Sequence, residues 1–134
     1  MVLVDMSVFI PFLKNQDTPE TRALDRIIED KIPFGISPYT YQELLQGVKT
    51  PAEFSLLKAY LETQRIYDLT QGLESFAAAA RMFFDCQKAG LTIRRGADLL
   101  IAQTAIENKL SLLHSDRDFI HLASIQKNLK CIEC

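Results

Sequence analysis

Short apolar segments alternate with amphipathic helical segments along almost the whole chain, and this alternation restricts the available folds. The strand candidates lie at residues 2–4, 33–36, 65–69, 111–114 and 130–132. Strands separated by helices pair in parallel through right-handed crossovers instead of forming hairpins. The pattern therefore predicts an α/β fold, specifically a three-layer α/β/α sandwich with a central parallel sheet.

The bulk composition is that of an ordinary globular protein. The chain has 134 residues, 48% of them hydrophobic and 24% charged, which suggests one domain over residues 1–134. No apolar run is long enough to span a membrane, and the N-terminus lacks the basic region of a signal peptide. We expect a cytoplasmic protein with no membrane partner. The net charge of −2 requires any nucleic-acid contact to use a local basic patch.

Four polar residues mark predicted helix starts. Ser7, Thr18, Ser37 and Thr50 occupy expected N-cap positions, and proline follows each of the last three directly. Thr50 also begins a capping-box pattern with Glu53, and its helix is predicted to run to about residue 64. The other predicted helices span about 73–89, about 97–108 and a short stretch after residue 116.

The three cysteines are not expected to carry chemistry. Cys86 falls within a helical pattern and is predicted to be a core residue. Cys131 and Cys134 form a C-x-x-C motif, but a zinc site needs two more ligands and only His114 and His121 are available. Without a secretory signal, the thiols are expected to remain reduced.

Acidic residues stand at the ends of several predicted elements. Asp5 follows the first strand, Asp116 follows strand 111–114, Asp98 begins a helix, and Glu43 lies on a helix flank. Ligands of open parallel sheets bind outside the carboxyl ends of the strands, where these side chains would meet. Two structural alternatives stay open: Asp5 closes a turn, and Asp98 is favoured by the helix dipole.

A cluster of four carboxylates would need a compensating cation. Two like charges about 4 Å apart repel by roughly 4 kcal/mol at an effective dielectric near 20. Oxygen-only ligands suit Mg²⁺ or Mn²⁺, which can promote in-line displacement at a phosphodiester. Spacing alone is weak support for this hypothesis, because the chain contains 17 acidic residues.

The local sequence around each acid resembles the motifs of PIN-domain ribonucleases. Residues 4–10 (VDMSVFI) resemble that family's opening V-D-T-S-V-x-I, and residues 41–44 (YQEL) resemble its second motif. Residues 93–102 contain an Asp before a Leu-Ile-Ala run, and residues 113–119 resemble the closing D-x-D-F motif. The order agrees along nearly the whole chain. Its compact size resembles the VapC toxins of bacterial toxin–antitoxin pairs.

The resemblance implies a Mg²⁺-dependent endoribonuclease, with Mn²⁺ as a possible substitute. The implied catalytic, metal-binding acids are Asp5, Glu43, Asp98 and Asp116. Asp118 is a further metal-ligand candidate, either in place of Asp116 as the fourth acid or as a brace for the loop.

Three polar neighbours are candidate substrate-binding residues. Ser7 would orient Asp5 or a metal-bound water, whereas Arg94 and Arg95 would hold RNA phosphates or remain solvated. Met6 departs from the family's commoner Thr, at a position that supplies no ligand.

The resemblance also implies partners: an RNA substrate, a small antitoxin protein and a second copy in a homodimer. Phe83 and Phe84 are candidate dimer residues or plain core. Three alternatives stay open. They are a PIN-type RNA-processing or DNA-directed nuclease that is not a toxin, an inactive PIN-like binding module, and a receiver-like signalling module.

Overall fold

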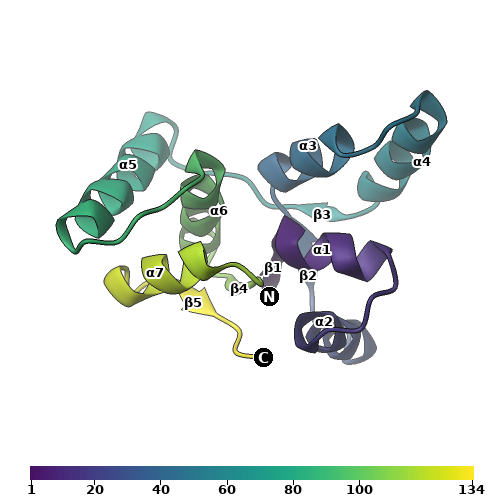
Figure 1. Ribbon diagram of the computed structural model, residues 1–134, viewed down its shortest axis with the longest axis horizontal. Helices are drawn as coiled ribbons and strands as arrows, with labels where there is room; N and C mark the ends of the chain where they lie inside the picture. The colour runs from purple at the N-terminus through teal and green to yellow at the C-terminus, as the bar shows by residue number, and fades with distance from the viewer.

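The central sheet has five short strands, and every neighbouring pair is parallel. The computed structural model describes residues 1–134, and its strand order is β3-β2-β1-β4-β5 (Figure 1). The strands are β1 (Val2–Val4), β2 (Phe34–Ile36), β3 (Arg65–Ile66), β4 (Ser111–Leu113) and β5 (Lys130–Cys131). The predicted parallel sheet is confirmed.

Seven helices cover the two faces of this sheet. They are α1 (Met6–Leu13), α2 (Pro19–Glu29), α3 (Pro38–Gln46), α4 (Pro51–Leu61), α5 (Leu73–Lys88), α6 (Gly96–Glu107) and α7 (Arg117–Ile125). Figure 1 shows α1 to α4 on one side and α5 to α7 on the other. The three-layer α/β/α architecture is confirmed.

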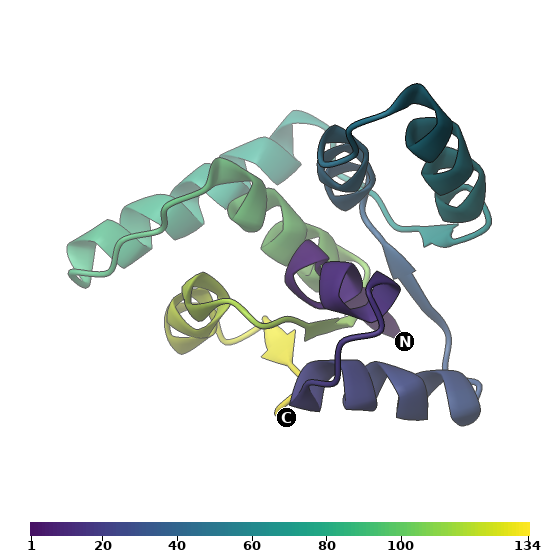
Figure 2. The same cartoon turned by 45° about the vertical axis from the view of Figure 1, so that its right-hand side comes forward.

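Two hydrophobic cores form because side chains alternate along each strand. In β1, Val2 and Val4 pack in the core shared with α1 to α4, whereas Leu3 packs in the core shared with α5 to α7. Cys86 lies in the second core, as predicted. Figure 2 shows α5 alongside α6, and the two helices are in contact. None of the helices combines the length and apolarity needed to cross a membrane.

The strand order reverses beside β1. The chain proceeds from β1 through β2 to β3 in one direction, and then returns to place β4 on the other side of β1. Ligands of open α/β sheets bind at such a switch point, outside the carboxyl ends of the strands. Receiver modules have the order 2-1-3-4-5. The observed order therefore excludes the receiver-like alternative.

The predicted N-cap of the first helix is wrong. Asp5, with extended backbone angles (φ −81°, ψ 158°), caps α1, and its carboxylate accepts from the Ser7 N–H. Ser7 lies inside the first turn. Both residue types are good caps, and the one that keeps extended geometry after the strand takes the role. The predicted caps Thr18, Ser37 and Thr50 are confirmed.

The largest differences at element ends are in β3 and α4, and the capping box of α4 is incomplete. The β3 strand covers only residues 65–66 instead of 65–69, because its partner β2 ends at Ile36 and offers no further residues to pair with. Helix α4 ends at Leu61 rather than near residue 64. The capping box at Thr50 is half formed: the Thr50 hydroxyl accepts from the Glu53 N–H, but the Glu53 carboxylate accepts from the Lys49 N–H.

Candidate active site

Asp5 lies at the switch point, and its two carboxylate oxygens have different surroundings. The Asp5 N–H donates to the Leu113 carbonyl of β4 (3.0 Å). Oδ2 accepts from the N–H (3.0 Å) and the hydroxyl (2.7 Å) of Ser7, and the Ser7 hydroxyl accepts from the Ser115 N–H (2.9 Å). Oδ1 is buried without a hydrogen-bond partner. Ser7 thus joins the loops after β1 and β4 and fixes the Asp5 carboxylate.

Asp116 and Asp118 follow β4 and are held by the start of α7. Asp116 is the N-cap of α7, and its Oδ1 accepts from the Asp118 N–H (3.0 Å) and from Arg94 Nη2 (3.1 Å). Asp118 Oδ2 accepts from the Arg94 N–H (3.1 Å) and Nε (3.4 Å). Asp118 thus ties the segment before α6 to the start of α7.

Asp98 is the most enclosed acid of the site. It lies in the first turn of α6 and is only 1% exposed, and its Oδ2 has no hydrogen-bond partner. Burial is the main cause that raises the pKa of Asp98 to about 7. The positive charge of Arg95 lowers this pKa, and the negative charges of Asp5, Asp116 and Asp118 raise it further. Asp98 is a first-turn acid of α6, and it also lies close to Asp116 and Asp118.

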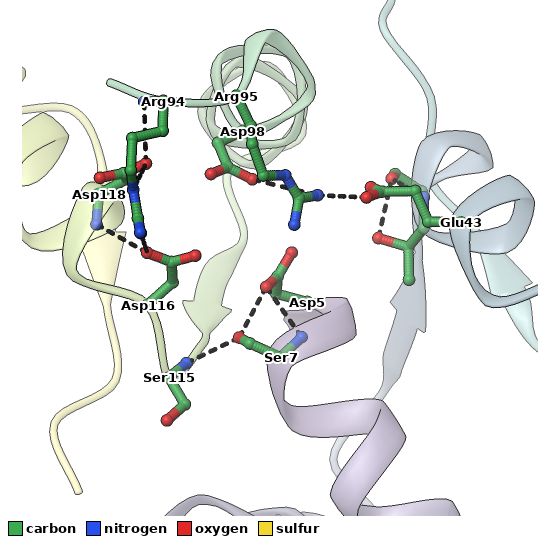
Figure 3. A network of polar contacts seen from close by, with 11 residues as sticks. Asp5, Ser7, Glu43, Arg94, Arg95, Asp98, Ser115, Asp116 and Asp118 are labelled. Carbon is green, nitrogen blue, oxygen red and sulfur yellow. Dashed lines mark hydrogen bonds and ion pairs between the residues drawn. The ribbon is translucent and has the colours of Figure 1, made fainter. Parts of the chain in front are cut away.

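Glu43 reaches the site from the opposite helical layer. It lies on α3 half-buried, and Arg95 Nη2 contacts its Oε2 and also lies 3.6 Å from Asp98 Oδ1. Burial raises the pKa of Glu43, with Arg95 lowering it and Asp5 raising it. Its Oε1 is buried without a partner. Figure 3 shows the Arg95 guanidinium between Asp98 and Glu43, with Asp5 below it.

The structure gathers the five predicted acids, but not equally. Asp98, Asp116 and Asp118 each place a carboxylate oxygen within 4.8 Å of the others, and no other group of three potential ligands is this close. Asp5 and Glu43 lie alongside (Figure 3). An all-oxygen donor set with unpartnered buried oxygens fits a hard divalent cation such as Mg²⁺ or Mn²⁺.

Two residues that were not predicted to belong to the acidic site help to shape it. His114 Nδ1 accepts from the Asp116 N–H (3.1 Å), and burial lowers the pKa of His114 against the attraction of Asp5 and other acids. Ser115 donates its N–H to Ser7. Their position between β4 and Asp116 was the only available signal.

A cavity of about 760 Å³ adjoins the acids on the side of Asp116. His114, Arg117 and Ile120 line it, together with Cys131 and Cys134 at the C-terminal segment. All three cysteines are free. The C-x-x-C cysteines belong to no group of three potential metal ligands.

The chain belongs to the PIN domain family, whose model matches residues 2–125. Several solved structures share the fold. The VapBC2 structure from Rickettsia felis has 18% identity and a TM-score of 0.73, with 98% of each chain covered. VapBC-1 from nontypeable Haemophilus influenzae has 18% identity and a TM-score of 0.71, with 99% of this chain and 98% of the other covered. VapBC-5 from Mycobacterium tuberculosis has 21% identity and a TM-score of 0.66, with 98% and 97% covered.

Proposed function

We propose that this protein is a metal-dependent endoribonuclease whose catalytic centre lies at the carboxyl ends of β1 and β4. The observation that carries the proposal is the convergence of five carboxylates from α3, α6, the start of α7 and the ends of β1 and β4. Three of their oxygens are buried without partners. A purely structural role would leave these oxygens satisfied, because unpaired buried polar groups are costly.

Each acid has a distinct part in holding the metal. Asp98 would be the central ligand, with Asp116 and Asp118 on one side of it and Asp5 and Glu43 on the side toward α3. A bound Mg²⁺ or Mn²⁺ supplies an activated water and charge stabilisation for in-line phosphodiester displacement. Ser7 keeps Asp5 oriented, since its hydroxyl and N–H hold Oδ2 and leave Oδ1 free.

The substrate would approach along the exposed side of the acids. Arg94 and Arg95 are the nearest cations and remain our candidates for RNA phosphate contacts. Both now pair with acids, so such contacts require them to exchange partners. The cavity next to Asp116 provides polar and apolar walls along this route.

Cleavage of purified RNA tests the proposal directly. The protein should cut total RNA in the presence of Mg²⁺ or Mn²⁺, and EDTA should stop the reaction. Asp5→Asn keeps the shape of the cap but removes its charge, so cleavage should collapse while the circular dichroism spectrum stays unchanged. Mapping the cut ends identifies the target. Equal cleavage by Asp5→Asn would overturn the proposal.

The same site supports a second level of the proposal, a toxin controlled by a small antitoxin. Three of the similar structures are of VapBC proteins, and one of these is a member of the VapBC family of toxin–antitoxin systems. The acidic site favours inhibition by a basic side chain, most simply an Arg, that replaces the metal charge. Apolar anchors on exposed helix faces would supply the remaining affinity.

Growth measurements separate a toxin from an RNA-processing nuclease. Expression of the chain in bacteria should arrest growth, and Asp5→Asn should relieve the arrest. Co-expression of the short neighbouring reading frame should restore growth, and its product should co-purify. If the active chain is harmless and no neighbouring product binds, a non-toxin PIN nuclease becomes the better proposal.

We further propose a homodimer that uses exposed apolar side chains. Phe83 packs against the core, which leaves Phe84 (49% exposed) as the available residue of the predicted pair. Leu73 and Phe76 are also exposed on α5. Sedimentation at micromolar concentration should give the dimer mass, and a monomer alone would remove the claim.

A further inference from the structure

Two neighbouring arginines neutralise different parts of the acidic site. Arg94 binds Asp116 Oδ1 and Asp118 Oδ2, the same two oxygens that already accept backbone N–H groups. Its side chain is 66% exposed. It therefore lies at the outer rim and consolidates oxygens that are already occupied by the fold.

Arg95 has a different position. Its Nη2 joins Glu43 Oε2 on α3 to Asp98 Oδ1 on α6, so its guanidinium lies across the gap between the two helical layers (Figure 3). The other oxygens of both carboxylates, Glu43 Oε1 and Asp98 Oδ2, are buried and unpartnered. Arg95 thus compensates the charge of this pair without completing its hydrogen bonds.

A hydrogen-bonded guanidinium and a divalent cation cannot occupy the same gap. The two positive charges would repel each other at this short distance. To bind the ion, Glu43 and Asp98 would also have to turn toward it the oxygens that now contact Arg95. Arg95 is also the N-cap residue of α6 and makes no side-chain capping bond, so its guanidinium can move without breaking the helix end.

We propose that Arg95 is a built-in competitor of the metal ion: it holds the Glu43–Asp98 gap in the metal-free protein and leaves it when the metal binds. The inference rests on the proposed function and adds a consequence to it. The released guanidinium would leave both carboxylates to the ion, so a substrate phosphate becomes a favourable new partner for it. A phosphate that holds Arg95 outward therefore favours metal binding, and by linkage the metal favours phosphate binding equally.

Calorimetric titration with Mn²⁺ tests this exchange without measuring cleavage. Arg95→Gln should tighten Mn²⁺ binding about tenfold, within the range typical of coupled sites. Arg94→Gln removes an equal charge from the rim and should tighten binding by only about twofold, through lost long-range repulsion. Arg81→Gln, from an exposed pair on α5, is the control and should match wild type. Thermal melts check that each variant is folded.

A second titration, in the presence of uridine 5′-monophosphate as a phosphate probe, separates competition from simple repulsion. The nucleotide should tighten Mn²⁺ binding in wild type, and much less in Arg95→Gln. Arg95→Lys keeps the charge but cannot contact Glu43 and Asp98 at once as the guanidinium does. Its Mn²⁺ affinity should therefore lie between those of the wild type and Arg95→Gln.

Equal tightening by Arg94→Gln and Arg95→Gln, or nucleotide coupling that survives in Arg95→Gln, would overturn the competitor role and leave the nuclease proposal intact. Unchanged Mn²⁺ affinity in Arg95→Gln would do the same. Absence of Mn²⁺ binding in every variant would defeat both proposals.

Discussion

Helix α6 carries a carboxylate near each end, and the two differ in their hydrogen bonding and in the direction of their pKa shifts. At its last turn, Glu107 accepts from the Thr70 N–H (2.7 Å), the Thr70 hydroxyl (3.1 Å), the Ser75 hydroxyl (3.0 Å) and Gln103 Nε2 (2.8 Å). Burial raises the pKa of Glu107, but these bonds outweigh it and leave the pKa below its ordinary value. At the first turn, Asp98 is more deeply buried, and its pKa rises to about 7.

The difference distinguishes a structural carboxylate from one kept for a ligand. Glu107 fastens the segment before α5 to the end of α6, and every bond it makes is internal. Asp98 has one distant ion-pair partner and an unpartnered buried oxygen. A buried charge without enough partners costs stability unless a cation or a proton compensates it. The predictions below probe this contrast from its largest effect to its smallest.

Cleavage activity should depend on one end of α6 and not on the other. Asp98→Asn removes a metal-binding charge without changing shape, so the rate of RNA cleavage should fall about 10³-fold, or about 4 kcal/mol in the barrier. Glu107→Gln is the matched control and should cleave like wild type. Initial rates on one RNA substrate at saturating Mg²⁺ measure both. Similar losses in the two variants would erase the distinction.

The pH dependence of stability should reveal the unsatisfied charge of Asp98. Its folded-state pKa of about 7 lies above the ordinary value, so the folded state binds this proton more tightly than the unfolded state. The resulting stability is fully present below about pH 4 and is lost as the pH rises through about 7.

Between pH 5 and pH 8 in EDTA, the free energy of unfolding of the wild type should therefore fall by about 2–3 kcal/mol more than that of Asp98→Asn. Urea denaturation at several pH values measures the difference. Parallel stability curves for the two proteins would contradict the assignment.

Truncation of the Glu107 side chain, in the last turn of α6, should destabilise the protein at every pH. Glu107→Ala leaves the Thr70 N–H and the fully buried Ser75 hydroxyl without their acceptor, at a cost of about 2 kcal/mol. Glu107→Gln keeps an acceptor oxygen and should recover most of that loss. Chemical denaturation at pH 7 provides the comparison, and an unaffected Glu107→Ala would show that the bonds contribute little.

The smallest effect concerns the orientation of Asp5. Ser7→Ala removes one of two donors to Asp5 Oδ2 and the link to Ser115, while the Ser7 N–H remains. Because residues that orient metal ligands typically change affinity by about 10–100-fold, we expect Mn²⁺ binding to weaken about tenfold. Ser7→Thr should restore it. Unaltered affinity in Ser7→Ala would show that the backbone cap alone positions Asp5.

The sequence predicted the residues that lie where strands end. Asp5 and Asp116 could be placed near one another because the alternation of strands and helices predicts a parallel sheet, whose carboxyl ends share an edge. Glu43 and Asp98 were candidates from their places on predicted helices, and the motif resemblance supported all four acids. The fold class followed from the same alternation, without any knowledge of the strand order.

The ion pairs within the site could not be predicted from the sequence. Arg95 and Asp98 are three residues apart at a helix start, which indicates a possible contact. The second partner of Arg95 is Glu43 on α3, across the site, and only the three-dimensional packing brings the two side chains together. The cap of α1 was misassigned for a local reason, because Asp5 and Ser7 are both competent caps two residues apart.

Melting temperatures with and without Mn²⁺ test the central claim, that these acids bind a divalent metal, most directly. A ligand at 100 times its dissociation constant stabilises the native state by about 2.7 kcal/mol, which for a chain of this size raises the melting temperature by roughly 5–10 °C. Wild type and Glu107→Gln should show this full rise, and Asp98→Asn should show little or none. An equal rise in all three proteins would place the metal elsewhere and contradict the account.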